Sequence, residues 1–208
     1  MTPEERFSEA FPNHVLTIEK DDGLYRSLLF KKPGCSMFWC RVVTWPNGLA
    51  LTGDCGSFMV GHPAVSDILR WFPADRDYLA GKITGHGAHN SLYEYSKEMA
   101  LKAVDAFRGY ILDAYPGPDE DEDEPEEMLP MHVQKLADLD ELKADIKRGG
   151  VFESELRERL LEIDSDSWEW SFQALSWQFR FQCLAVDAIR DTYLKNSTED
   201  LLQVSLNC

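Results

Sequence analysis

The sequence predicts an α+β fold, in which an antiparallel sheet of four to five strands over residues 14–61 packs against C-terminal helices. Three observations predict this class. Residues 14–61 contain short runs rich in β-branched, aromatic and aliphatic residues, each closed by Gly, Pro, Asn or Asp. After residue 62 the spacing of apolar residues becomes helical. No apolar run approaches the roughly 20 residues that a membrane-spanning helix needs.

The strands are separated by recognisable turn sequences. The tripeptide DDG at residues 21–23 and the tripeptide PNG at residues 46–48 each lie between two strand-like runs. Such turns join neighbouring antiparallel strands, so both predict hairpins. A third bend is indicated by the glycines and the cysteine of residues 53–56, before the last run at residues 57–61.

Helical spacing accounts for most of the remaining chain. A short helix is expected at the N-terminus, with Thr2 as its N-cap and Pro3 at its first position. A long helix is expected to start at a capping box made by Ser91 and Glu94. The predicted helices cover residues 3–11, 63–72, 91–115, 136–147, 152–163 and 167–195, and residues 73–90 are predicted to be irregular.

These elements predict one compact unit in three segments. Residues 1–115 would form a core of sheet and helix, and residues 116–130 an acidic linker or insertion. Residues 131–208 would be helical and pack on the same core. The helices at residues 91–115 and 167–195 would cover the sheet, and those at residues 132–163 would form a lobe or flap.

The chain is strongly acidic, with a net charge of −16 and a pI near 4.6. Eight of the acids lie between residues 119 and 127, a stretch with no basic residue. Such a chain repels nucleic acid and anionic lipid, so it is either an ordinary soluble acidic protein or one whose acidic face meets a basic surface on a partner protein. The acidic run is either a solvated surface insertion or a docking segment that mimics phosphate charge. The predicted partner-binding residues are Asp119, Glu120, Asp121, Glu122, Asp123, Glu124, Glu126, Glu127, Trp168 and Trp170.

The N-terminal sequence and the cysteines indicate a cytoplasmic protein. Residues 1–11 are acidic and amphipathic, unlike a secretory signal. The five cysteines are odd in number and repeat no disulfide framework, so free thiols are expected, with Cys183 in the core.

Several segments resemble an uncharacterised protein family of bacteriophage and prophage genomes. They are HVLTIEKDDGLYRSLLF, SMFWCRVVTWPNGLALTGDCGSFMV, SLYEYSKEM and WQFRFQCLAVDAIRDTY. The family typically shows a DDGLYRHL-like turn, a VTWPG-LA strand pair and a GDMG strand. The chain has Cys55 where the family usually has Met, and Asp187 where it usually has Trp. The resemblance implies a phage or mobile-element origin and a bacterial host cytoplasm, and it implies no catalytic activity.

Residue types suited to chemistry are present, but their spacing is poor. A zinc site or a Cys/His/Asp nucleophile would draw on Cys35, Cys40, Cys55, Asp54, His62, His86 and His89. The tight paired spacings of structural zinc sites are missing, so no metal or cofactor is predicted. Asp21 and Asp22 are expected to serve the first turn.

The sequence therefore favours a binding protein over an enzyme. The leading hypothesis is a phage-encoded accessory protein that inhibits a host defence system, such as CRISPR or another nuclease, through acidic protein–protein contact. The alternative hypothesis is a small hydrolase or metal-dependent enzyme that uses Asp54, His62, His86 and His89. An enzyme would keep its activity without a partner, whereas an inhibitor would bind one stoichiometrically.

Overall fold

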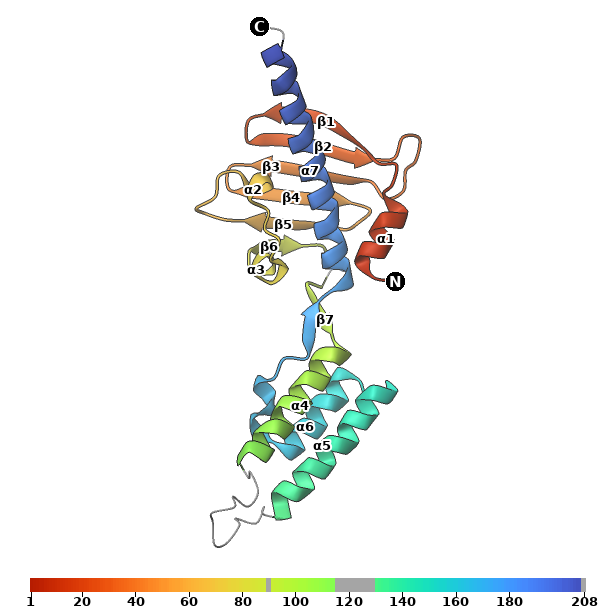
Figure 1. Cartoon of the computed structure of the whole chain (residues 1–208), viewed down its shortest axis with the longest axis vertical. Coiled ribbons are helices and arrows are strands. Elements are labelled where there is room, and N and C mark those ends of the chain that lie inside the picture. Colours follow the sequence, from red (N-terminus) through yellow and green to blue (C-terminus); the bar gives the residue numbers. More distant parts are fainter. Residues whose placement is uncertain (89–90, 115–129, 207–208) are drawn as a thin grey trace. The chain divides into compact units, whose positions relative to one another are not determined.

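The structure is a computed structural model that describes residues 1–88, 91–114 and 130–206. The chain divides into two compact units. The sheet unit comprises Met1–Glu94 and Leu175–Cys208, and the helical unit comprises Tyr95–Ala174. The chain crosses between them in two short strands, β7 (Tyr93–Tyr95) and β8 (Gln173–Leu175), which pair with each other (Figure 1).

The sheet unit contains a six-stranded sheet whose strands follow one another in sequence order. Every neighbouring pair is antiparallel. The strands are β1 (Val15–Asp22), β2 (Tyr25–Lys31), β3 (Cys40–Trp45), β4 (Gly48–Gly53), β5 (Phe58–Gly61) and β6 (Ile83–His86). The α+β class and the antiparallel sheet with C-terminal helices are confirmed.

Both predicted hairpin turns are confirmed, and each depends on a residue with positive φ. Gly23 has φ +61° at the first position of the two-residue loop between β1 and β2. Asn47 has φ +68° at the second position of the loop between β3 and β4, after Pro46. Glycine and asparagine adopt this conformation at low cost, so the local sequence selects both turns.

Helices α1 (Pro3–Ala10) and α7 (Trp177–Leu206) belong to the sheet unit, and α7 runs across one face of the sheet (Figure 1). The predicted Thr2 cap of α1 is present as a capping box with Glu5. Phe11, just after α1, packs against Phe181 of α7 with ring centroids 5.7 Å apart. Side chains at alternate positions of the strands point toward α7 and form the core with it. The core includes Leu28, Val42, Leu49, Leu51, Phe58 and Val60 of the strands and Phe179, Cys183, Val186 and Ile189 of α7.

The helical unit consists of α4 (Lys97–Ala114), α5 (Pro130–Arg148), α6 (Glu153–Ile163) and the 3₁₀ helix η1 (Ser165–Glu169). It has its own core of Ala100, Val104, Ile111, Leu139, Leu142, Ile146, Leu156, Leu160, Ile163 and Phe172. Helix α5 begins at Pro130, before the predicted start at residue 136, and it ends at Arg148, close to the predicted end at residue 147. Gly149, which follows it, has φ +82° and donates to the carbonyl of Asp145.

The sheet is larger than predicted. Residues 73–90 were expected to be irregular, but β6 lies within them and pairs with β5. Residues 63–72 were expected to be one helix, but only α2 (Ile68–Trp71) forms there, followed by α3 (Arg76–Ala80). Four-residue elements with glycine and proline nearby carry too few periodic positions for a reliable prediction.

The predicted starts of the two long helices are wrong. Helix α4 begins at Lys97, where the Ser96 hydroxyl accepts the N–H of Met99. Glu94 is not part of its cap, because its carboxylate accepts the N–H of Trp177 at 2.9 Å. Residues 167–176 were expected to be helical but form the end of η1 and then β8. Pairing between β7 and β8 takes these segments out of the helices.

The unit boundaries differ from the predicted segments 1–115, 116–130 and 131–208. Helix α4 was expected to cover the sheet, but its buried residues lie in the core of the helical unit. Helices α5 and α6 share that core, so they do not pack on the core of the sheet. The acidic segment lies outside the described residues apart from Pro130, the first residue of α5.

Candidate functional site

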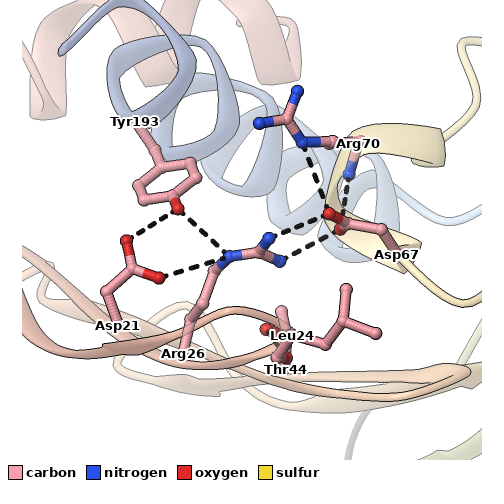
Figure 2. A network of polar contacts seen from close by, with 7 residues as sticks. All are labelled: Asp21, Leu24, Arg26, Thr44, Asp67, Arg70 and Tyr193. Carbon is pink, nitrogen blue, oxygen red and sulfur yellow. Dashed lines mark hydrogen bonds and ion pairs between the residues drawn. The ribbon is translucent and has the colours of Figure 1, made fainter. Parts of the chain in front are cut away.

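A buried guanidinium connects several elements of the sheet unit. Arg26 on β2 is 6% exposed, and its terminal nitrogens donate to both carboxylate oxygens of Asp67 at 3.0 and 2.9 Å. Its Nε donates to the Tyr193 hydroxyl at 3.2 Å, and that hydroxyl donates to Asp21 at 2.7 Å (Figure 2). Arg26 therefore joins β1, β2 and α7 to the segment before α2.

Asp67 has a second role as the N-cap of α2. Its carboxylate accepts the backbone N–H of Arg70 at 3.2 Å and lies 3.4 Å from the Arg70 guanidinium (Figure 2). Burial alone would raise the pKa of Asp67, but the hydrogen bonds and charges of Arg26 and Arg70 outweigh burial and lower it. The charged groups in this cluster face one another, so its geometry favours a structural role.

We expect the contribution of Asp67 to stability to disappear in acid. Because its pKa is lowered in the folded protein, the ionised carboxylate stabilises the fold above its unfolded pKa of about 3.9, and this is lost as pH falls through the folded pKa. The difference in unfolding free energy between wild type and Asp67→Asn should therefore be largest near neutral pH and shrink below about pH 4. Urea titrations across this range measure it.

The matched control is Asp75→Asn. Asp75 caps α3 by accepting the N–H of Tyr78, and no ion pair with an arginine is present for it among the described residues. Asparagine is also a good N-cap, so Asp75→Asn should lower the unfolding free energy much less than Asp67→Asn does. A difference for Asp67→Asn that stays constant down to pH 2, or grows in acid, would contradict this account.

A second polar cluster of the sheet unit involves Asp187. Asp187 on α7 pairs with Arg76, and it lies 3.2 Å from Arg190. Arg190 also donates to the backbone carbonyl of Phe72 at 2.9 Å. Burial raises the pKa of Asp187, and the two arginine charges oppose this shift. The cluster ties α7 to the segment that contains α2 and α3.

The helical unit carries an aromatic patch, defined here as Phe107, Tyr110 and Trp170. The ring centroids of Phe107 and Trp170 are 4.9 Å apart, and those of Phe107 and Tyr110 are 6.3 Å apart with nearly parallel rings. Tyr110 is 69% exposed. A hollow of about 330 Å³ lies beside the patch, lined by Ala103, Ala106, Phe107, Trp170 and Ser171. The patch offers an open apolar surface.

Further exposed apolar side chains gather near the end of α4. Arg108 lies 3.0 Å from Asp140, and Lys143 donates to Asp105. These two ion pairs show that α4 and α5 run antiparallel, so the C-terminal end of α4 lies beside the N-terminal end of α5. The exposed large apolar residues at this end are Tyr110, Leu112, Met131 and Val133. In sequence, they flank the acidic run on both sides.

The charge of the protein is concentrated in the helical unit. Residues 95–174 hold 22 acids against nine lysines and arginines, so they carry −13 of the total charge of −16. The larger sheet unit carries the remaining −3. A strong negative field and an exposed aromatic patch therefore belong to the same 80-residue unit.

The predicted partner-binding residues are only partly covered by the structure. The acids of residues 119–127 lie outside the described residues, as does the side chain of Trp168. Trp170 is half-buried against Phe107 and contributes to the aromatic patch. Sequence reasoning missed Phe107 and Tyr110, although their spacing of three along a helix already places them on one face.

The residues of the alternative enzyme hypothesis do not meet. His86 of β6 pairs with Phe58 at one end of β5, and His62 follows the other end of β5, roughly 13 Å along the strand. His62 instead contacts the Tyr78 hydroxyl at 3.2 Å. Asp54 is exposed in the bend after β4, and His89 lies outside the described residues. In the described part of the chain, no group of three His, Cys, Asp or Glu side chains is placed to hold a metal ion.

Two other residues differ from the sequence-based interpretation. Asp21 was expected to serve the first turn, but its carboxylate accepts the Tyr193 hydroxyl. Arg26 was not singled out, although strand alternation places it on the same side as Leu28 and Phe30. An arginine at an inward strand position signals a buried acidic partner, and this signal could have identified the network.

Comparisons with protein-family models, with curated proteins and with solved structures yield no match for this chain. Among the described helices, none combines the length and the apolar character needed to cross a bilayer.

Proposed function

We propose that this chain is a binding protein whose helical unit contacts a basic surface on a partner protein. The observation that carries the proposal is the coincidence of −13 charges and an exposed aromatic patch in one small unit. The sheet unit is nearly neutral, so the charge is not spread evenly as it would be for solubility alone.

The two features would make different contributions to binding. The negative field speeds association with a basic surface and weakens as salt screens it. Partly exposed Tyr and Trp side chains are the residues that most often supply affinity at protein interfaces. Tyr110 and Trp170 would therefore anchor the partner, and the acids of the same unit would orient it.

The resemblance to a phage family suggests the kind of partner. We propose a host defence protein, such as a CRISPR effector or another nuclease, in the cytoplasm of a bacterial host. A nuclease presents a basic groove for the nucleic-acid backbone, which an acidic, aromatic protein surface can occupy. Direct binding of this chain to nucleic acid is disfavoured by the same charge.

Replacing residues 119–127 with a Gly/Ser segment of equal length tests the proposal. The full-length chain should capture one bacterial protein in stoichiometric yield at low salt and release it at high salt. The substituted chain should capture at least about tenfold less, because much of the steering field is gone. The measurement is affinity capture from host lysate with quantitative mass spectrometry, after circular dichroism has shown that the fold is intact.

The control is a variant that loses charge elsewhere in the same unit. Glu158→Gln with Glu162→Gln removes two exposed charges on α6 without touching the aromatic patch. This double variant should capture the partner nearly as well as wild type. Undiminished capture by the Gly/Ser chain would show that the acidic run is a surface insertion and would contradict its part in the proposal.

A further inference from the structure

Two cysteines of the sheet unit lie against each other in the core. Cys40 begins β3 and is 0% exposed, and Cys55 lies in the bend after β4 and is 2% exposed. Their Sγ atoms are 2.6 Å apart, so either thiol can donate to the other.

The backbone of the β3–β4 hairpin brings the two side chains together. Cys40 pairs with Gly53, which has φ +133°. A Cβ atom at Gly53 would lie 2.3 Å from the carbonyl oxygen of Trp39, so only glycine fits there. The N–H of Asp54 donates to that same carbonyl at 3.0 Å. The bend therefore turns the chain back, and Cys55 comes to lie over Cys40.

Both cysteines are held in place by neighbouring elements. Cys40 lies between β2 and β4, where it pairs with Phe30 on one side and Gly53 on the other. The carbonyl of Cys55 accepts the side-chain amides of Gln178 and Gln182 on α7, the latter at 3.0 Å. Disulfide sulfurs are about 2.0 Å apart, so a bond needs a sulfur shift of less than about 1 Å and no change of fold.

We propose that Cys40 and Cys55 are an oxidisable pair that closes into an intramolecular disulfide in the sheet unit. The oxidant is a small-molecule disulfide such as oxidised glutathione. One thiolate attacks it, forms a mixed disulfide and releases one glutathione thiol. The second cysteine thiolate then attacks the mixed disulfide and releases the second glutathione thiol. The two cysteines lose two electrons and two protons, and one glutathione disulfide becomes two thiols.

The surroundings make this exchange slow in the folded protein. The neighbouring Cys55 thiol and burial both raise the pKa of Cys40 well above its usual range. Because the thiolate is the reactive form, oxidation proceeds during folding or local opening of the hairpin. The bond, once formed, is shielded from reductants in the same way. The pair therefore keeps the oxidation state in which the protein folded and changes only slowly when the surrounding redox potential changes.

The experiment is refolding of the full chain from urea in buffers of defined reduced and oxidised glutathione, followed by acid quenching. Peptide mapping under non-reducing conditions should find Cys40 linked to Cys55. The bond closes a loop with 14 residues between the cysteines. It should raise the thermal midpoint of the oxidised protein above that of the reduced protein by roughly 6–12 °C.

Three variants complete the test. Cys40→Ala and Cys55→Ala should each remove the linked peptide and abolish the difference between oxidised and reduced midpoints. Cys183→Ala is the matched control, because Cys183 is equally buried and burial raises its pKa to about 12. This variant should keep both the linked peptide and the difference. Cys40 and Cys55 found free in the most oxidising buffer, or linked to other cysteines, would overturn the proposal.

Discussion

Replacing Arg26 with methionine is expected to destabilise the sheet unit by about 3–5 kcal/mol. The substitution keeps an apolar side chain in the core but leaves Asp67 without its two strongest hydrogen bonds. The Tyr193 hydroxyl also loses a donor. Removing one partner of a buried ion pair costs more than the pair itself contributes, because the remaining charge stays desolvated. Urea-dependent hydrogen exchange of peptides from β2 and β3 measures the sheet unit alone.

Arg41 provides a matched control on the next strand. It donates to both carboxylate oxygens of Glu19 at 2.9 Å, which resembles the geometry of Arg26 with Asp67. Arg41 is about one-third exposed, however, so Arg41→Met should cost only about 0–1 kcal/mol. If the two substitutions lowered the unfolding free energy equally, burial would not be the reason that the Arg26 network stabilises the fold.

The double variant Arg26→Met/Asp67→Asn should lose less unfolding free energy than the sum of the losses caused by the two single substitutions. Once the Asp67 charge is removed, the methionine no longer leaves a carboxylate without its buried guanidinium partner. If the two losses of unfolding free energy simply added, the result would contradict the direct pairing of these side chains.

Tyr110→Ala is expected to weaken partner binding by about 10- to 30-fold, which corresponds to about 1.4–2 kcal/mol. Tyr110 is the most exposed ring of the aromatic patch, so its removal takes away contact area without opening the core. The stability of the helical unit should change little. Equilibrium titration of the captured partner with wild-type and variant chains gives the affinity ratio.

Tyr25→Ala is the matched control, since Tyr25 is 52% exposed and belongs to the sheet unit. It should leave affinity unchanged within about twofold. If Tyr25→Ala weakened binding as much as Tyr110→Ala, the contact could not be confined to the helical unit.

Local chemistry predicted the elements whose conformation is set by a few neighbouring residues. The glycine of the first turn and the asparagine of the second each supply the positive φ that their hairpins require. The Thr2 capping box and the glycine that ends α5 are local in the same sense. The buried residues of β2, β3 and β5 also follow a local rule, since they alternate along each strand.

What the sequence failed to predict depends on contacts between distant residues. Glu94 reads locally as part of a helix cap, but it caps α7, which begins more than 80 residues later. The boundaries between the two units fall within β7 and β8, which pair with each other although each is only three residues long. The aromatic patch was only partly foreseen through Trp170, because its contact with Phe107 joins residues that are distant in sequence.

The central claim is that a partner protein binds the helical unit at its aromatic patch. The most direct measurement places a photo-reactive benzoyl-phenylalanine at position 110 or at position 25 of the full chain in host lysate. The account predicts that one partner with a basic surface crosslinks at position 110, that the crosslink fades as salt rises, and that position 25 gives none. Equal crosslinking at both positions, or no crosslink at position 110 at low salt, would contradict it.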